Sequence, residues 1–251
     1  MSKAQPKAKA EELFNTIETL SLEERKDQLT LKRLAREAKS LASVDSVASY
    51  ICQGMISFYE NKPDDVRRLF DKAIKISPVN SIIAQNYAVT LNQMGFHKEH
   101  LEYADTAYKL NQDDPSHLET AIFANIVNGK FDTAYELVLR ASKLRLNSDS
   151  ITVRNNILQF IRSNSISPSD FVKLQDTAYN LLHSKKIFVM KPSLGISEDE
   201  DSTCLSYQIL LDKPVREIVD LDVMHAQALA REPSLLEISN KVVIYFTSWC
   251  D

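Results

Sequence analysis

One spacing recurs through the middle of the chain and constrains its fold more than any other feature. Ala73, Ala107 and Ala141 lie 34 residues apart, twice in succession. Two further columns keep the same 34-residue step. Asn61, Gly95 and Gly129 fall in short turns, and Gly54, Ala88 and Ile122 precede those turns by seven residues. Three columns in one phase predict stacked copies of a single supersecondary unit.

Each copy reads as a helix of about fourteen residues, a turn and a second helix. Small residues in the first and second helices let neighbouring helices approach closely. The Gly or Asn of the turn tolerates the left-handed backbone that ends a helix. In the first copy, Val47–Asn80, the dipeptide Ser77-Pro78 stops the second helix.

These columns resemble the tetratricopeptide-repeat (TPR) family. The matching residues are Tyr50, Gly54, Phe70, Ala73 and Pro78 in the first repeat, Tyr87, Ala88, Gly95, Tyr103 and Ala107 in Ser81–Asp114, and Gly129, Phe131, Ala134 and Ala141 in Pro115–Ser148. His100 stands where that family has a small residue. A degenerate fourth repeat follows at about 149–185, with Ala178 three residues late. The resemblance covers about residues 47–185 and implies a mainly α, TPR-like α-α solenoid.

The flanks suggest a division of the chain into four segments. Residues 1–8 are expected to be disordered, 9–45 to form capping helices, 46–185 the repeats, and 186–251 a small α/β domain. Ser21 to Glu24 has the spacing of a capping box and predicts a helix start. After Lys186, short β-branched and aromatic runs surround a helix that begins near Pro214, which predicts a β-β-α-β unit. The four acids Glu198–Asp201 are expected in an exposed loop.

Composition narrows the classes of function. The net charge is −4, so the chain lacks the overall positive field that attracts nucleic acid or anionic membranes. Only four glycines occur, which disfavours phosphate-binding loops. Three cysteines suit a reducing compartment, and neither a secretory signal nor a membrane-length apolar run is found. A cytoplasmic protein is predicted.

No motif in the sequence demands catalysis, so an enzyme, a cofactor and a metal site are not predicted. His97 and His100 have an i, i+3 spacing that two metal ligands can use, but they lack a third ligand and are interpreted as exposed turn residues. Cys204 and Cys250 would need the fold to bring them beside His225 to act as nucleophiles. They are interpreted instead as apolar strand residues.

The family resemblance implies that the first helix of each repeat lines a concave groove. By register, the candidate partner-binding residues are Ile51, Met55, Phe58, Tyr59, Ile82, Gln85, Val89, Asn92, Glu119, Phe123, Ile126 and Val127, with Val153, Arg154, Ile157 and Phe160 in the fourth repeat. The apolar character of this surface favours an amphipathic helix or an extended apolar peptide from another protein. Chaperone-binding members of that family hold a peptide carboxylate with Lys, Asn and Arg, whereas Ile51, Met55, Glu119 and Phe123 stand at several of the comparable positions here. The leading hypothesis is therefore an interaction scaffold, adaptor or regulator.

Four alternatives remain open from the sequence. The groove could be filled by the chain's own N-terminal helices or tail. An enzyme site could lie between the solenoid and the C-terminal unit. The chain could self-associate through the edge of its last strand, KVVIYFTS. Nucleic acid is a further alternative, which the sequence disfavours because its basic clusters have no interleaved aromatic residues. These clusters are Arg33, Arg36 and Lys39, and Arg140, Lys143 and Arg145.

Overall fold

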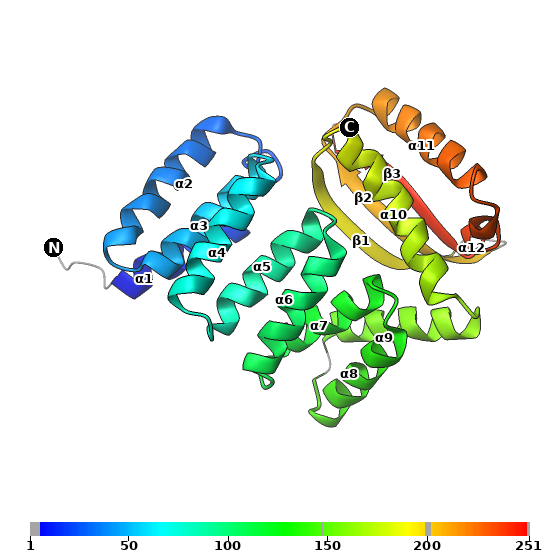
Figure 1. Cartoon of the computed structure of the whole chain (residues 1–251), viewed down its shortest axis with the longest axis horizontal. Coiled ribbons are helices and arrows are strands. Elements are labelled where there is room, and N and C mark those ends of the chain that lie inside the picture. The colour runs from blue at the N-terminus through cyan, green and yellow to red at the C-terminus, as the bar shows by residue number, and fades with distance from the viewer. Residues whose placement is uncertain (1–5, 147, 199–201, 250–251) are drawn as a thin grey trace.

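The computed structural model describes residues 6–146, 148–198 and 202–249, and it is mainly helical with a small three-stranded sheet near the C-terminus (Figure 1). The helices of the first three quarters are α1 (Pro6–Glu18), α2 (Gln28–Ser40), α3 (Ser46–Tyr59), α4 (Pro63–Ile76), α5 (Ser81–Gln93), α6 (His97–Leu110), α7 (Pro115–Val127), α8 (Phe131–Lys143), α9 (Asp149–Ser163) and α10 (Pro168–Ser184). The remainder contains β1 (Val189–Glu198), β2 (Thr203–Leu211), α11 (Val215–Ala230), α12 (Leu236–Ser239) and β3 (Val242–Ser248). Short 3₁₀ turns occupy Leu41–Ser43 and Pro233–Leu235.

Three helix pairs, α3/α4, α5/α6 and α7/α8, follow the 34-residue step. Each pair packs together and against the pair that follows it in the chain. The turns inside the pairs have positive φ at Asn61 (54°), Gly95 (77°) and Gly129 (70°), as the turn column predicted. The column of Ala73, Ala107 and Ala141 is fully buried, so these alanines lie between helices and not on solvent faces.

Helix α10 departs from the arrangement expected for a fourth repeat. It does not pack along α9 as α4 packs along α3; it packs on β3, α11 and the segment around α12. In Figure 1 it crosses in front of the sheet. Its outer side contacts the turns of the second and third pairs, where the Tyr179 ring lies beside Gly95 and the Pro168 carbonyl lies beside Gly129. Helix α10 therefore packs between the turns of the helix pairs and the C-terminal unit.

The N-terminal flank forms two helices, and their bounds differ from the sequence expectation at two places. Helix α1 begins at Pro6, inside the segment expected to be disordered; residues 1–5 lie outside the described part. The capping box forms, because Ser21 N–H donates to Glu24 (2.8 Å) and Glu24 N–H donates to Ser21 Oγ (3.2 Å). It encloses only a turn, and α2 starts after Asp27, whose carboxylate accepts from two backbone N–H groups.

The C-terminal segment is the predicted β-β-α-β unit. Strand β2 lies in the centre, antiparallel to β1 and parallel to β3, and α11 makes the crossover that a parallel pair requires. Alternate residues of β2 are fully buried and share one apolar cluster with α7, α8, α9, α10 and α11: Leu205, Tyr207, Ile209 and Leu211. The hydrophobic core is thus continuous from the third helix pair into the sheet. Of the acidic run, residues 199–201 lie outside the described residues, whereas Glu198 ends β1 and is exposed.

Strand β3 is an edge strand of the sheet, as the self-association hypothesis assumed. One of its backbone donors is already used, because the N–H of Phe246 donates to the Asp222 carboxylate of α11 at 3.2 Å. Burial raises the pKa of Asp222, and the hydrogen bond from Phe246 opposes that rise. Because this N–H group already has a partner, it is not free to pair with a strand of a second molecule.

Candidate functional site

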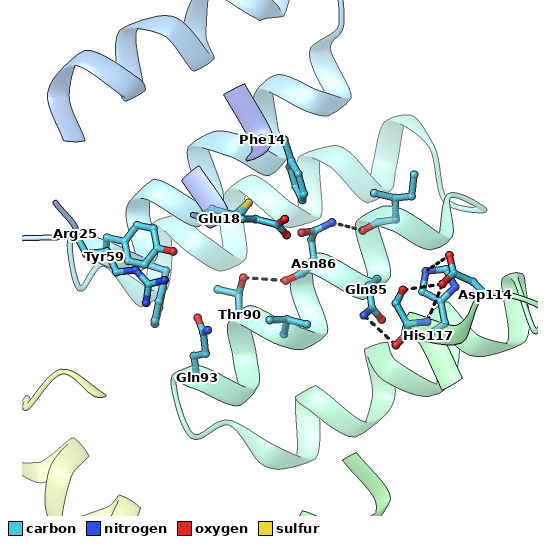
Figure 2. A pocket seen from close by; sticks show the side chains of 15 residues that line it. Phe14, Glu18, Arg25, Tyr59, Gln85, Asn86, Thr90, Gln93, Asp114 and His117 are labelled. Carbon is cyan, nitrogen blue, oxygen red and sulfur yellow. Dashed lines mark hydrogen bonds and ion pairs between the residues drawn. The ribbon is translucent and has the colours of Figure 1, made fainter. Parts of the chain in front are cut away.

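A pocket of about 480 Å³ opens among α1, α3, α5 and the start of α7 (Figure 2). Helix α1 and the turn after it contribute Phe14, Glu18 and Arg25 to the lining, and α3 contributes Met55, Phe58 and Tyr59. The remaining lining residues are Ile82, Gln85, Asn86, Val89, Thr90 and Gln93 of α5, and Asp114, Ser116 and His117 around the start of α7. Ile82 and Val89 are 57% and 40% exposed. Two large apolar side chains are therefore presented to solvent on the wall of a concavity, where a partner can bury them.

The structure brings together six of the twelve residues chosen from the first three repeats. Met55, Phe58, Tyr59, Ile82, Gln85 and Val89 all line this pocket. They come from the first helices of two successive pairs, which is the geometry expected for a groove between repeats. The tilted stacking of Phe58 on Tyr59, with ring centroids 5.1 Å apart, fixes the aromatic end of the pocket.

The other six candidates do not line it. Ile51, Ile126 and Val127 are core residues, each at most 4% exposed, so they cannot contact a partner directly. Asn92 is only partly buried, yet its Oδ1 atom is enclosed and has no partner among the described atoms. The face assigned to the first helices was therefore too wide, because part of it packs against the neighbouring helices.

Glu119 and Phe123 are engaged by α9. The Glu119 carboxylate accepts hydrogen bonds from Ser148 (2.6 Å) and Ser150 and pairs with Arg154 at 3.4 Å. Burial alone would raise the pKa of Glu119, but these bonds and the arginine lower it. The Arg154 guanidinium also lies 5.6 Å from the Phe123 ring centroid. Of the other fourth-repeat candidates, Val153 is exposed, Ile157 is buried and Phe160 is partly buried.

Sequence reasoning missed the contribution of α1. Figure 2 shows Phe14 and Glu18 on the α1 side of the pocket, facing the α5 residues. Phe14 lies in the segment interpreted as a cap, whose helices were also considered as occupants of the groove, and it packs against the clusters on both sides of α3. The N-terminal flank therefore forms one wall of the groove through α1. It does not fill the groove, because the pocket beside α1 is open.

The polar lining of the pocket is rich in side-chain amides. Gln85 Nε2 donates to Thr120 Oγ1 (2.6 Å), and Asn86 Nδ2 donates to the Ile82 carbonyl (2.8 Å). The side chain of Gln93 makes no hydrogen bond with the described residues, and it points into the same pocket (Figure 2). Amides both donate and accept, so they suit the backbone of a bound chain.

Three charged groups stand at the ends of the pocket. Burial raises the pKa of the Glu18 carboxyl, which forms no ion pair with a described residue. Arg25 lies 5.1 Å from the Tyr59 ring centroid, and Tyr59 has a pKa raised by burial. At the far end, burial would raise the pKa of Asp114, but its hydrogen bonds with Ser116 lower it. The pocket therefore carries an unpaired acid near its aromatic end.

The C-terminal unit contacts Phe58, one of the aromatic residues that line the pocket. Phe188, just before β1, stacks on Phe58 with ring centroids 5.0 Å apart. Lys26 forms an ion pair with Asp212 at the end of β2, and its Nζ lies 4.1 Å from the Trp249 ring centroid. A smaller pocket of about 230 Å³ lies at this junction, and Arg25 and Tyr59 separate it from the larger one.

The histidines and the described cysteine that the sequence raised as possible metal ligands or nucleophiles occupy the following places. His97 and His100 are 9% and 1% exposed, so the interpretation of them as exposed turn residues was wrong. No group of three or more His, Cys, Asp or Glu residues in the described ranges is placed to hold a metal ion. His225 is buried and shares a hydrogen bond with Thr177 Oγ1 (2.9 Å). Cys204 lies partly exposed in β2, and Cys250 lies outside the described residues.

None of the helices in residues 6–146, 148–198 and 202–249 has both the length and the apolar character of a membrane span. Comparison of the chain with protein-family models, with curated proteins and with solved structures finds no match.

Proposed function

We propose that the protein is a TPR-like interaction module that holds a segment of another protein in the pocket between α1, α3 and α5. The observation that carries this proposal is the exposure of Ile82 and Val89 on a wall that also contains Met55 and Phe58. Apolar side chains exposed in a concavity favour burial by a partner. The 34-residue step and the positive-φ turns support the assignment of the helix pairs as repeats.

The lining favours an extended apolar segment over a helix. A helix satisfies its own backbone groups and needs only an apolar groove. An extended chain leaves its N–H and C=O groups free, and Asn86 and Gln93 of α5 offer amides on the pocket lining to meet them. Its apolar side chains would enter the space between Phe14, Met55 and Val89.

The substitution Val89→Glu tests the proposal with little risk to the fold. Val89 is 40% exposed, so a glutamate there remains hydrated in the free protein but is desolvated when an apolar segment binds. We expect proteins captured from a lysate by the wild-type chain to fall by about tenfold or more with the variant. Quantitative mass spectrometry of the captured proteins measures this.

The matched control is Val153→Glu on α9, where the valine is 47% exposed and does not line the pocket. Capture by this variant should equal that of the wild-type chain. Circular dichroism confirms that both variants stay helical. Equal capture by Val89→Glu and wild type would show that partners bind elsewhere on the molecule.

A further inference from the structure

A second pocket lies on the opposite side of α3 and has a different chemistry. It has a volume of about 360 Å³ and is lined by α2, α3 and α4: Lys32, Ala35, Arg36, Lys39, Gln53, Ile56, Ser57, Glu60, Lys62, Asp65, Arg68 and Leu69. The α3 residues that line it are distinct from Met55, Phe58 and Tyr59, which line the first pocket. The two pockets therefore occupy opposite faces of one helix, and a ligand in one does not block the other.

The rim of this second pocket is strongly basic. Five of its residues are Lys or Arg and two are Asp or Glu, a balance of +3 in a chain whose net charge is −4. Two of the five cations are neutralised locally, because Lys62 pairs with Glu60 (2.8 Å) and Arg68 pairs with Asp65 (2.7 Å). The excess positive charge comes from α2.

Lys32, Arg36 and Lys39 carry that excess. They follow one another at i, i+4 and i+7, so they project from one face of α2. None of the three has an ion pair or side-chain hydrogen bond with any residue in the described ranges. Arg33, on the same helix, is by contrast paired with Glu37 at 2.9 Å. Three neighbouring cations without counter-charges create a local potential that attracts an anion.

The buried part of the lining, which forms the floor, is mainly apolar, with Ser57 as its buried polar residue. Ala35 of α2, Ile56 of α3 and Leu69 of α4 lie beneath the charged rim. Its lining includes no aromatic side chain on which a nucleic-acid base could stack. The combination of a basic rim and an apolar floor suits an acidic peptide that carries aliphatic side chains, since its carboxylates meet the cations and its aliphatic groups meet the floor.

We propose that the face between α2 and α4 docks an acidic, aliphatic segment of a partner protein. This surface is independent of the one used for the proposed function, because the two lie on opposite sides of α3. The chain would then contact its partners at two places, an apolar one and a charged one, and simultaneous engagement would raise the overall affinity.

Fluorescence anisotropy with labelled synthetic peptides tests this docking face in the full chain. The probes are a short peptide of repeating Glu-Glu-Leu, one of repeating Lys-Lys-Leu, one of repeating Glu-Glu-Ser, and oligo-dT. We expect the Glu-Glu-Leu peptide to bind, the Lys-Lys-Leu peptide not to bind, and the Glu-Glu-Ser peptide to bind more weakly. Binding of Glu-Glu-Leu should also weaken as salt rises, because exposed charges are screened.

The double variant Arg36→Glu/Lys39→Glu should weaken Glu-Glu-Leu binding by about tenfold or more, since two attractions become repulsions. The control Arg33→Glu/Lys75→Glu makes the same change in net charge at positions of α2 and α4 that do not line the pocket, and it should leave binding within about twofold of wild type. Equal loss in both variants would show only a general charge effect and overturn the proposal. So would preferential binding of oligo-dT, equal binding of the Glu-Glu-Ser peptide, or no binding of any probe.

Discussion

Lowering the pH from 6.5 to about 4 is expected to remove most of the stability of the folded chain, because two histidines of α6 are buried without the means to hold a proton. His97 and His100 are 9% and 1% exposed. Burial, together with smaller effects of the nearby His100 and His183, lowers the pKa of His97 to about 3. Burial lowers the pKa of His100 to about 4, against a smaller opposing effect of its hydrogen bond with the Ala88 carbonyl.

The sign of this dependence follows from proton binding in the two states. In the unfolded chain both histidines take up protons near their ordinary pKa of 6.5, whereas in the folded chain they stay neutral until about pH 4 or below. Because the unfolded state binds more protons in this window, stability falls as the pH falls. Each histidine lowers the free energy of unfolding by about 1.4 kcal/mol for each pH unit. For two histidines between pH 6.5 and about pH 4, the loss is on the order of 7 kcal/mol. The free energy of unfolding of a domain is only about 5–15 kcal/mol in total.

The variant His97→Phe separates this effect from the protonation of carboxylates. Neither ring nitrogen of His97 has a partner among the described atoms, and the ring packs edge-on against Tyr179 at 4.7 Å. Phenylalanine keeps that packing without a titrating group, so the midpoint of acid unfolding should move to lower pH by roughly one unit. The exposed His183, replaced by Gln, is the control and should move the midpoint much less than His97→Phe does, because His183 acts on acid unfolding mainly through its small effect on the pKa of His97. The histidine explanation fails if His97→Phe unfolds at the same pH as wild type.

The substitution Gly95→Ala is expected to destabilise the protein by about 2–5 kcal/mol. Gly95 has a φ of +77°, where a side chain costs about 1–2 kcal/mol. A Cβ atom there would lie 2.0 Å from Cδ1 of Tyr179. Tyr179 cannot easily swing away, because it is buried and its hydroxyl is 3.1 Å from that of Tyr207. The added methyl group would therefore push α10 off the turn.

Urea unfolding of Gly95→Ala and Gly195→Ala measures this difference. A Cβ at Gly195, in β1, would meet nothing within 4 Å, so that variant should change the free energy of unfolding by less than about 1 kcal/mol. We expect the transition of Gly95→Ala to shift to clearly lower urea concentration. Coincident transitions for the two variants would mean that α10 does not rest on the turn in solution.

The helix pairs were predictable because several positions of the repeat admit few residue types. The turn needs a residue that adopts a left-handed backbone, such as Gly95, and the helix crossing needs a small residue, such as Ala107. These residue types therefore recur in the sequence at a fixed spacing. The C-terminal unit was predictable for a similar reason, since β-branched runs on either side of an amphipathic stretch fit few other arrangements.

The place of α10 was not predictable from local pattern. An apolar helical face is the same in sequence whether it packs on another helix or on a sheet, and Ala178 and Leu182 fit either. The pocket was half predictable for the same reason. Register identified the α3 and α5 residues, but whether Phe14 would lie beside them depended on the path of the chain between α1 and α2.

The contact of Lys26 with Asp212 and Trp249 bears on how the chain can fold during synthesis. Translation makes Lys26 long before the strand that ends near Asp212, so this contact must wait until most of the helical part has left the ribosome. Pairings between residues so distant in the chain form slowly. Until they form, the aromatic end of the first pocket lacks its Phe188 neighbour. A nascent chain would thus expose apolar surface there, and a chaperone is most needed at that stage.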